Sequence, residues 1–161
     1  MRASSQYELT TLWHFDAPLE SVWTALVDAE RWPRWWPGIE EVVVLEPGND
    51  DGVGARRRYT CRSVLPYRLT FVSRVTALEP LRLLEGRVEG ELEGRGCCRL
   101  TRCDGRVLVR YDWRVRTTRR WMNLVAPLAK PLFRWNHDML MEAGGRGLAR
   151  YLKARTDARI A

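Results

Sequence analysis

Hydrophobic and polar residues alternate along most of the first two thirds of the chain, a pattern typical of β-strands with one buried face. From Tyr7 to Phe15 the odd positions are mostly aromatic or aliphatic, and the even positions are polar apart from Leu12. His14 is therefore expected to point outward. Further strands are predicted at residues 39–45, 53–63, 67–78, 82–89, 91–102 and 107–117, separated by turn sequences such as PGNDDG and CDG. Together these strands predict one antiparallel sheet, which is too long to stay flat and is expected to curl.

The last predicted strand has an unusually aromatic face. One set of alternating residues is Val107, Val109, Tyr111, Trp113 and Val115, and the opposite set is Leu108, Arg110, Asp112, Arg114 and Arg116. Because successive side chains of a strand point to opposite faces, the first set is expected to face the interior. Tyr59, Tyr67, Leu69 and Phe71 are assigned to the same inner face.

Helical spacing begins after the first strand. Asp16 is expected to be the N-cap of a short helix in which Val22, Trp23, Leu26 and Val27 form the buried stripe. The following sequence RWPRWWPG has too many prolines for a long helix and predicts a helical turn that acts as a lid.

A longer helix is predicted after Trp121, with interruptions at Pro127 and Pro131 and a continuous course from there to about Arg155. Its apolar stripe recurs at three and four residues and consists of Phe133, His137, Leu140, Met141, Gly144, Leu148 and Tyr151. Gly144, Gly145 and Gly147 each lower helix stability by about 1 kcal/mol relative to alanine. The helix is therefore expected either to approach the sheet closely or to leave space between them.

Composition and charge narrow the class of protein. The 161 residues are 45% hydrophobic and 29% charged, which predicts one globular domain over residues 1–161. No apolar run reaches the length of a membrane span, and the first residues lack a signal peptide, so a cytoplasmic location is expected. The net charge of +7 is spread along the strands, with Arg56, Arg57 and Arg58 as its densest group. We therefore expect no nucleic-acid partner.

The four cysteines do not have the spacing of a metal site. Cys97 and Cys98 are adjacent and point to opposite faces of a predicted strand, while Cys61 and Cys103 stand alone. All four are expected to be reduced, and neither a metal nor another cofactor is expected.

The segments DAPLESVWTALVDAERWPRWWPGI, EGELEGRG with LVRYDWRVRTTRRW, and RWNHDMLMEAGGRGLARYL occur in an order that resembles the START-like (SRPBCC) superfamily. The resemblance is to its bacterial polyketide cyclase/dehydrase and lipid-transport branch, and it covers nearly the whole chain. It implies an α+β helix-grip fold: a curved seven-stranded antiparallel sheet wrapped around a long C-terminal helix, with two short helices after the first strand. It also implies an internal apolar cavity, but not one activity, because relatives include cyclases, carriers and hormone receptors.

Aromatic side chains dominate the candidate ligand-binding residues. These are Trp36, Tyr59, Tyr67, Leu69, Phe71, Tyr111, Trp113, Trp121, Trp135, His137 and Met141. So many large side chains in a small domain favour a cavity lining over a densely packed core. Arg57 shares a strand face with Tyr59, so it either meets an anionic group of a ligand or lies exposed at the strand end.

His137 is the candidate catalytic residue, although a lone histidine on an apolar helix face is more often a core residue than a base. No carboxylate pair, nucleophile triad or phosphate loop accompanies it in the sequence. This favours the binding of a hydrophobic, ring-containing small molecule or lipid in the cavity. The alternatives are a polyketide cyclase or dehydratase that uses the same cavity, and a regulatory or assembly protein with a vestigial cavity. The sequence leaves the oligomeric state open.

Overall fold

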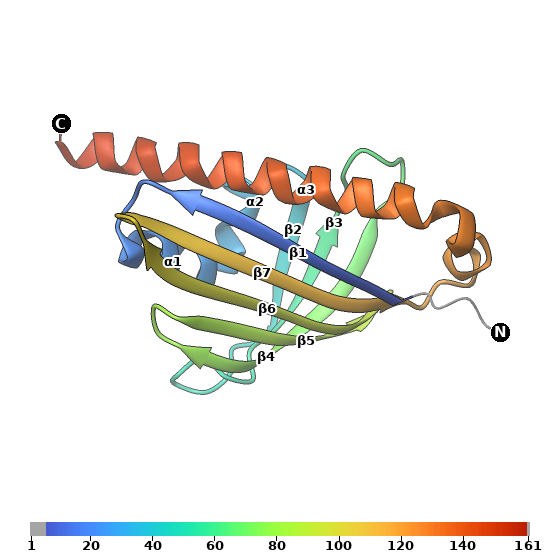
Figure 1. Cartoon of the computed structure of the whole chain (residues 1–161). Coiled ribbons are helices and arrows are strands. Elements are labelled where there is room, and N and C mark those ends of the chain that lie inside the picture. Colours follow the sequence, from blue (N-terminus) through green and yellow to red (C-terminus); the bar gives the residue numbers. More distant parts are fainter. Residues whose placement is uncertain (1–5, 161) are drawn as a thin grey trace.

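The computed structural model describes residues 6–160 of the chain (Figure 1). Its elements follow one another as β1 (Gln6–Phe15), α1 (Leu19–Val27), the 3₁₀ turn η1 (Ala29–Arg31), α2 (Trp32–Trp35), β2 (Ile39–Glu46), β3 (Arg56–Cys61), β4 (Leu69–Glu79), β5 (Leu83–Gly90), β6 (Leu92–Cys103), β7 (Arg106–Thr117) and α3 (Arg120–Ile160). The predicted strands are all present, with ends that differ by a few residues.

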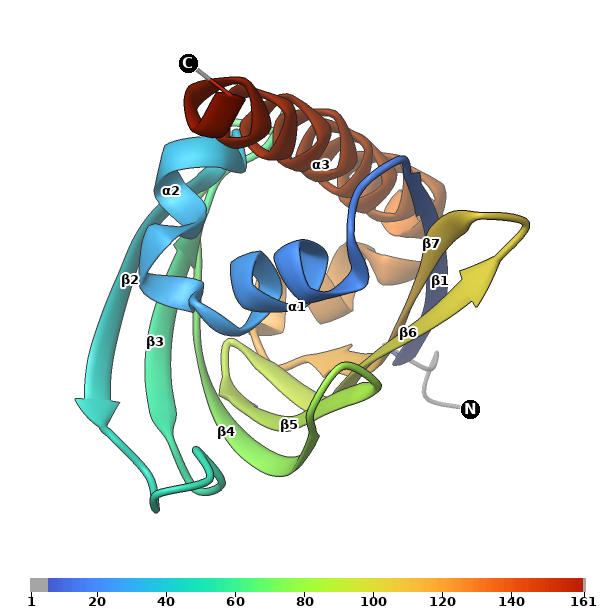
Figure 2. The same ribbon diagram turned by 90° about the vertical axis from the view of Figure 1, so that its left-hand side faces the viewer.

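The strands form one seven-stranded antiparallel sheet in the order β1-β7-β6-β5-β4-β3-β2. The sheet curls around the interior, and α3 runs across its open side (Figures 1 and 2). Seen from the end in Figure 2, α1 and α2 lie at one mouth of the curled sheet. This is the helix-grip architecture, so the predicted fold class is confirmed.

The side chains of β7 point to the two faces of the sheet as predicted. Val107, Val109 and Val115 are buried on the concave side, and the indole of Trp113 lies on the same side. A Cβ atom built on Gly96 would lie 3.6 Å from the Trp113 ring, and Gly96 pairs in register with both Trp113 and Gly86. The Trp113 indole therefore lies over Gly96 of β6, at van der Waals distance from the position a Cβ atom would occupy.

The glycines of α3 allow the helix to lie close to the sheet and to α2. This close approach was one of the two outcomes expected from their cost to helix stability. A Cβ on Gly145 would lie 2.8 Å from the Trp13 ring, and a Cβ on Gly144 would overlap the Trp36 indole. The same two indoles donate hydrogen bonds to α3, from Trp13 Nε1 to the Met141 carbonyl (3.1 Å) and from Trp36 Nε1 to the Leu140 carbonyl (2.9 Å). Trp32, Trp35 and Trp36 are all buried as a result.

Two local predictions are wrong. Asp16 does not cap α1: the N-cap is Pro18, without a side-chain hydrogen bond, because the Asp16 carboxylate instead pairs with Arg106 at the start of β7 (2.8 Å). The C-terminal helix is not interrupted at Pro127 and Pro131, which both lie inside α3. Its first turns instead run in a different direction from the rest (Figure 1), as expected where proline removes backbone hydrogen bonds without ending a helix.

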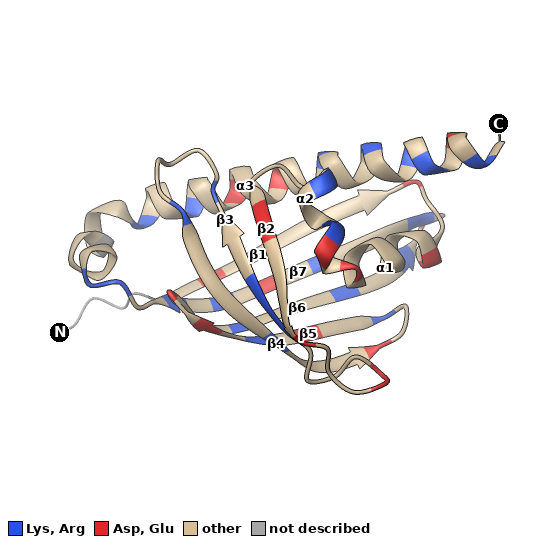
Figure 3. Cartoon of the chain, turned by 180° about the vertical axis from the view of Figure 1, so that it is seen from behind, with Lys and Arg blue, Asp and Glu red and all other residues tan. Residues whose placement is uncertain are grey.

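Basic and acidic residues are interspersed along the strands of the sheet (Figure 3). Arg56 pairs with Glu46 (2.6 Å), and Arg95 with Glu85 (2.5 Å), between neighbouring strands. The positive charge is therefore largely distributed among ion pairs. None of the described helices is both long enough and apolar enough to cross a membrane.

Candidate functional site

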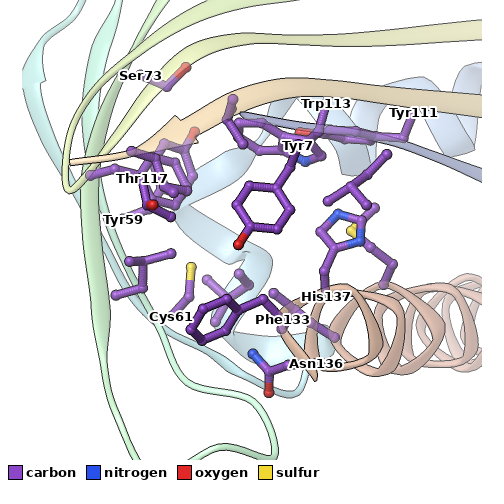
Figure 4. A pocket seen from close by; sticks show the side chains of 18 of the residues that line it. Tyr7, Tyr59, Cys61, Ser73, Tyr111, Trp113, Thr117, Phe133, Asn136 and His137 are labelled. Carbon is purple, nitrogen blue, oxygen red and sulfur yellow. The ribbon is translucent and has the colours of Figure 1, made fainter. Parts of the chain in front are cut away.

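An internal cavity of about 160 Å³ lies between the concave face of the sheet, α2 and the middle of α3 (Figure 4). Its walls are mainly apolar and aromatic. They are formed by Tyr7, Leu9, Trp32, Trp36, Ile39, Tyr59, Cys61, Tyr67, Leu69, Phe71, Ser73, Leu92, Tyr111, Trp113, Val115, Thr117, Met122, Phe133, Asn136, His137, Leu140 and Met141. None of these side chains is a carboxylate, an ammonium or a guanidinium group.

A closed series of aromatic contacts, here called the aromatic collar, borders one end of this cavity. It runs in order through Trp13, Trp36, Trp32, Tyr59, Phe71, Trp113 and Tyr111, and returns to Trp13, with neighbouring ring centroids 5.1 to 6.2 Å apart. Tyr59 stacks on Phe71, and Trp113 stacks on Tyr111, while Phe71 meets Trp113 edge to face. The collar thus offers both ring faces and ring edges to a bound aromatic molecule.

A second cavity, of about 340 Å³, lies on the other side of the collar, beneath α1 and η1. Trp32, Tyr59, Ser73, Tyr111 and Trp113 border both cavities, so these side chains separate them. Arg57 belongs to the wall of the second cavity only. Its side chain is 18% exposed and pairs with Glu30 of η1 (3.4 Å), so Arg57 is neither a free strand-end arginine nor a group of the first cavity.

Two polar atoms are buried in the first cavity without a hydrogen-bond partner among the described residues. They are the Tyr7 hydroxyl and Nε2 of His137. Figure 4 shows both side chains pointing into the space between the sheet and α3. The other ring nitrogen of His137, Nδ1, lies 3.4 Å from the Asp138 carboxylate outside the cavity.

Burial keeps the titratable groups of the cavity neutral. It lowers the pKa of His137, an effect that the nearby Asp138 carboxylate partly opposes. Burial also raises the pKa of Tyr7, Tyr59 and Tyr111, and raises that of the Cys61 thiol to about 12. The cavity is therefore an uncharged environment at neutral pH.

All of the predicted ligand-binding residues except Trp121 and Trp135 lie in the cavity wall. Trp121 packs against Tyr67 from outside, with ring centroids 5.7 Å apart, and both tryptophans are 45% exposed. The prolines in the first turns of α3 change the direction of the helix axis there. Helical spacing alone does not predict this change, and so did not predict the positions of Trp121 and Trp135. Whether the wall residues contact a ligand remains a prediction.

Sequence reasoning assigned no site role to several residues of the wall and the collar. Tyr7 and Trp13 had a usable signal, because strand alternation already placed them on the inner face. For Trp32 the sequence held no such signal. It is one of three tryptophans in an irregular turn, where no regular spacing indicates which way each side chain points. Among the described residues, no group of three or more His, Cys, Asp and Glu side chains is placed to hold a metal ion.

Comparison with known proteins identifies the family of this chain. Residues 7–153 match the sequence profile described as "Polyketide cyclase / dehydrase and lipid transport". No curated protein sequence matches the chain. Among solved structures, the Zhui aromatase/cyclase from Streptomyces sp. R1128 is similar with a TM-score of 0.74 and 18% identity, over 94% of this chain and 96% of that one.

A START superfamily protein from Mycobacterium smegmatis is similar with a TM-score of 0.73 and 14% identity, over 91% of this chain and 97% of that one. TTHA0849 from Thermus thermophilus gives a TM-score of 0.70 and 16% identity, over 90% and 99% of the two chains. At these identities the structural likeness shows the fold alone, whereas the profile covers most of the sequence. The chain therefore belongs to the polyketide cyclase/dehydrase and lipid transport family, within the START-like superfamily.

Proposed function

We propose that this protein binds a neutral, ring-containing hydrophobic small molecule with one hydrogen-bonding group in the cavity between the sheet and α3. One observation carries the proposal: an aromatic, uncharged cavity contains two buried polar atoms, the Tyr7 hydroxyl and His137 Nε2, that no described residue satisfies. The likeness to an aromatase/cyclase supports a ring-containing ligand.

The cavity volume sets the size of the ligand. A cavity of about 150 Å³ lined by apolar side chains in another protein binds benzene, and the cavity here measures about 160 Å³. A compound of roughly one or two rings is therefore the expected size. The collar side chains lie between this cavity and the second one, so a longer ligand would have to displace them.

The absence of charge from the cavity wall sets the polarity of the ligand. A carboxylate moved into this wall would lose its hydration without gaining a cationic partner, which is strongly unfavourable. Fatty acids and aromatic acids are therefore expected to bind poorly. Aromatic rings contribute large apolar contact surfaces that stay rigid on binding, so a neutral ring compound gains the most from this wall.

The two buried polar atoms set the position of the hydrogen-bonding group. Each unsatisfied buried group costs about 1–3 kcal/mol, which a ligand recovers if it supplies a partner. Neutral His137 donates or accepts at Nε2 according to its tautomer, and the Tyr7 hydroxyl does both. A phenolic hydroxyl, which also donates and accepts, suits either atom.

Calorimetric titration with a matched pair of ligands tests the proposal. 2-Naphthol and 2-naphthoate share a ring system, but only the second carries a charge at neutral pH. We expect a micromolar dissociation constant for 2-naphthol, equivalent to about −8 kcal/mol, and binding of 2-naphthoate that is weaker by at least about 100-fold. The affinity for 2-naphthol should change little with salt, because burial of apolar surface drives it.

Naphthalene and two variants provide the controls. Naphthalene lacks the hydroxyl and should bind less tightly than 2-naphthol to the unaltered protein. In Tyr7→Phe and His137→Leu, that preference for 2-naphthol should shrink, since the buried polar atoms are gone. Equal binding of 2-naphthol and 2-naphthoate, or binding of neither, would refute the proposal.

The same geometry gives a second candidate function, a cyclase or dehydratase reaction. Neutral His137, whose ring lies at the cavity wall with Nε2 buried and unpartnered among the described residues, is placed to accept a proton from a ring precursor held against the collar. Activity assays with a tetraketide or longer poly-β-ketone thioester, which can close a six-membered carbon ring with loss of water, would test this. His137→Gln should abolish turnover while leaving the affinity for 2-naphthol within a few fold; turnover that survives this change excludes His137 as the base.

A further inference from the structure

The first turns of α3 carry a second apolar face that points to solvent instead of into the cavity. It consists of Trp121, Leu124, Val125, Leu128, Leu132 and Trp135, here called the exposed apolar face. Leu124 and Leu128 are 83% and 91% exposed. The spacing of three and four residues places Trp121, Leu124, Val125 and Leu128 on one side of the first turns, and Leu132 and Trp135 continue this spacing beyond the prolines. The neighbouring positions Met122 and Phe133 line the cavity.

The charges within this stretch of α3 have one sign until Asp138, which follows Trp135 by three residues. Between residues 119 and 137 the sequence contains Arg119, Arg120, Lys130 and Arg134 and no acidic residue. Arg119 pairs with Glu91, while Arg120 and Arg134 make no ion pair within the described part of the chain. Figure 3 shows only basic charge on this part of α3. Exposed tryptophan and leucine beside arginine and lysine are typical of helices that lie in the interface of an anionic membrane.

We propose that the exposed apolar face docks this protein on the surface of an anionic phospholipid membrane. Protruding leucines such as Leu124 and Leu128 enter a fluid acyl layer without needing a matching pocket, which a folded protein partner would have to supply. The unpaired arginines complement lipid phosphates. Six exposed large apolar side chains within fifteen residues are unusual on a folded protein unless they serve an interaction.

The exposed apolar face is also connected to the cavity. Trp121, at one end of the face, contacts Tyr67 and Phe133, with ring centroids 5.7 and 6.3 Å apart. Tyr67 and Phe133 both line the cavity and contact each other. These three rings lie between the membrane-docking surface and the cavity interior, so docking would allow an apolar ligand to pass between the bilayer and the cavity. This exchange rests on the proposed function, whereas the docking itself does not.

Vesicle co-sedimentation of the full chain tests the docking. The probes are vesicles of phosphatidylcholine alone and vesicles of phosphatidylcholine mixed with phosphatidylglycerol. We expect binding to the mixed vesicles to be tighter by at least about tenfold, and to weaken as salt is added, because several basic side chains contribute. Leu124→Glu combined with Leu128→Glu should abolish binding. Arg120→Gln combined with Arg134→Gln should reduce the preference for phosphatidylglycerol.

Leu12→Glu is the matched control, because Leu12 is 55% exposed on β1 outside this face and should leave vesicle binding unchanged. Calorimetry with 2-naphthol separates the two proposals: the Leu124→Glu/Leu128→Glu variant should still bind 2-naphthol as the unaltered chain does. Unchanged vesicle binding by that variant would overturn the docking. So would an absence of vesicle binding together with dimers that Leu128→Glu dissociates, since the face would then bind a second copy of the chain.

Discussion

Gly147 of α3 lies directly against the backbone of Trp35, the last residue of α2. A Cβ atom built on Gly147 would overlap the Trp35 carbonyl oxygen and would lie 3.2 Å from Cδ of Pro37. A backbone carbonyl cannot rotate away as a flexible side chain can. The contact therefore fixes the distance between α2 and α3, and with it the position of Trp32 and Trp36 in the cavity wall.

Gly147→Ala is expected to lower the free energy of unfolding by about 1–3 kcal/mol, because α2 must move to admit the methyl group. Alanine gains about 1 kcal/mol of helix propensity over glycine, so a net loss identifies the steric cost. Chemical denaturation measures it. Lys153→Ala, an exposed position on the same helix, should change stability by less than about 0.5 kcal/mol. A stabilised Gly147→Ala variant would contradict the close contact.

Trp113 separates the two cavities, so its removal should change which ligands fit. Trp113→Ala is expected to join the cavities and to weaken 2-naphthol binding by about 1–3 kcal/mol through the lost ring contact. Three-ring phenols such as 2-anthrol should gain affinity relative to 2-naphthol, because the second cavity becomes accessible. Calorimetric titration of both compounds gives the comparison.

Trp→Ala changes in a protein core cost about 3–5 kcal/mol, so Trp113→Ala could leave too little folded protein to measure. Trp113→Phe, which keeps an aromatic ring, is the second variant. It should shift the preference in the same direction, by less. Trp135→Ala removes an indole outside both cavities and should leave the preference unchanged. An unaltered ratio of the two affinities in both Trp113 variants would show that this ring does not divide the interior.

The sheet and its inner face could be predicted from the sequence because strand alternation is a local property with a fixed period. On β7 that alternation gave the directions of Tyr111 and Trp113 correctly, and on β1 those of Tyr7 and Trp13. The close approach of α3 to its neighbours could also be predicted. Gly144, Gly145 and Gly147 lower the stability of the helix, and close packing offsets this cost.

The aromatic collar could not be predicted, because it depends on contacts between residues far apart in the sequence. Trp32 meets Tyr59 only when the turn after α1 folds over β3. The exclusion of Trp121 and Trp135 from the cavity depends on the bend of α3 near Pro127 and Pro131, where spacing predicted a break. Asp16 was assigned to the helix that follows it because its distant partner Arg106 is not visible in local sequence.

The cysteines should differ widely in reactivity. Burial raises the pKa of Cys61 to about 12 and raises those of Cys98 and Cys97, whereas Cys103 is exposed. Because the thiolate is the reactive form, a maleimide should label Cys103 of the folded protein first. Mass spectrometry over time measures the order. Cys103→Ser should remove the fast phase, and denatured protein should react at all of its cysteines. Fast labelling of Cys61 would mean that the cavity opens to solvent.

His137 should make stability depend on pH. In the unfolded chain its imidazole has a pKa near 6.5, whereas burial lowers that pKa in the folded protein. Between the two values the unfolded chain binds more protons, so stability is highest above the unfolded pKa and falls as the pH drops to the folded one, below which this contribution stays constant. The free energy of unfolding should therefore fall as the pH drops through this interval.

His137→Gln lacks this titration, and the fall in stability over the same interval should be smaller than in the unaltered protein. His14 and the carboxylates are present in both proteins, so the difference between the two pH curves isolates His137. A bound neutral ligand that donates a hydrogen bond to unprotonated Nε2 favours the uncharged ring further, because the imidazolium has no acceptor nitrogen. The affinity for 2-naphthol should consequently decrease at low pH in the unaltered protein and stay nearly constant in the variant. Parallel curves for stability and for affinity would show that His137 does not titrate inside the cavity.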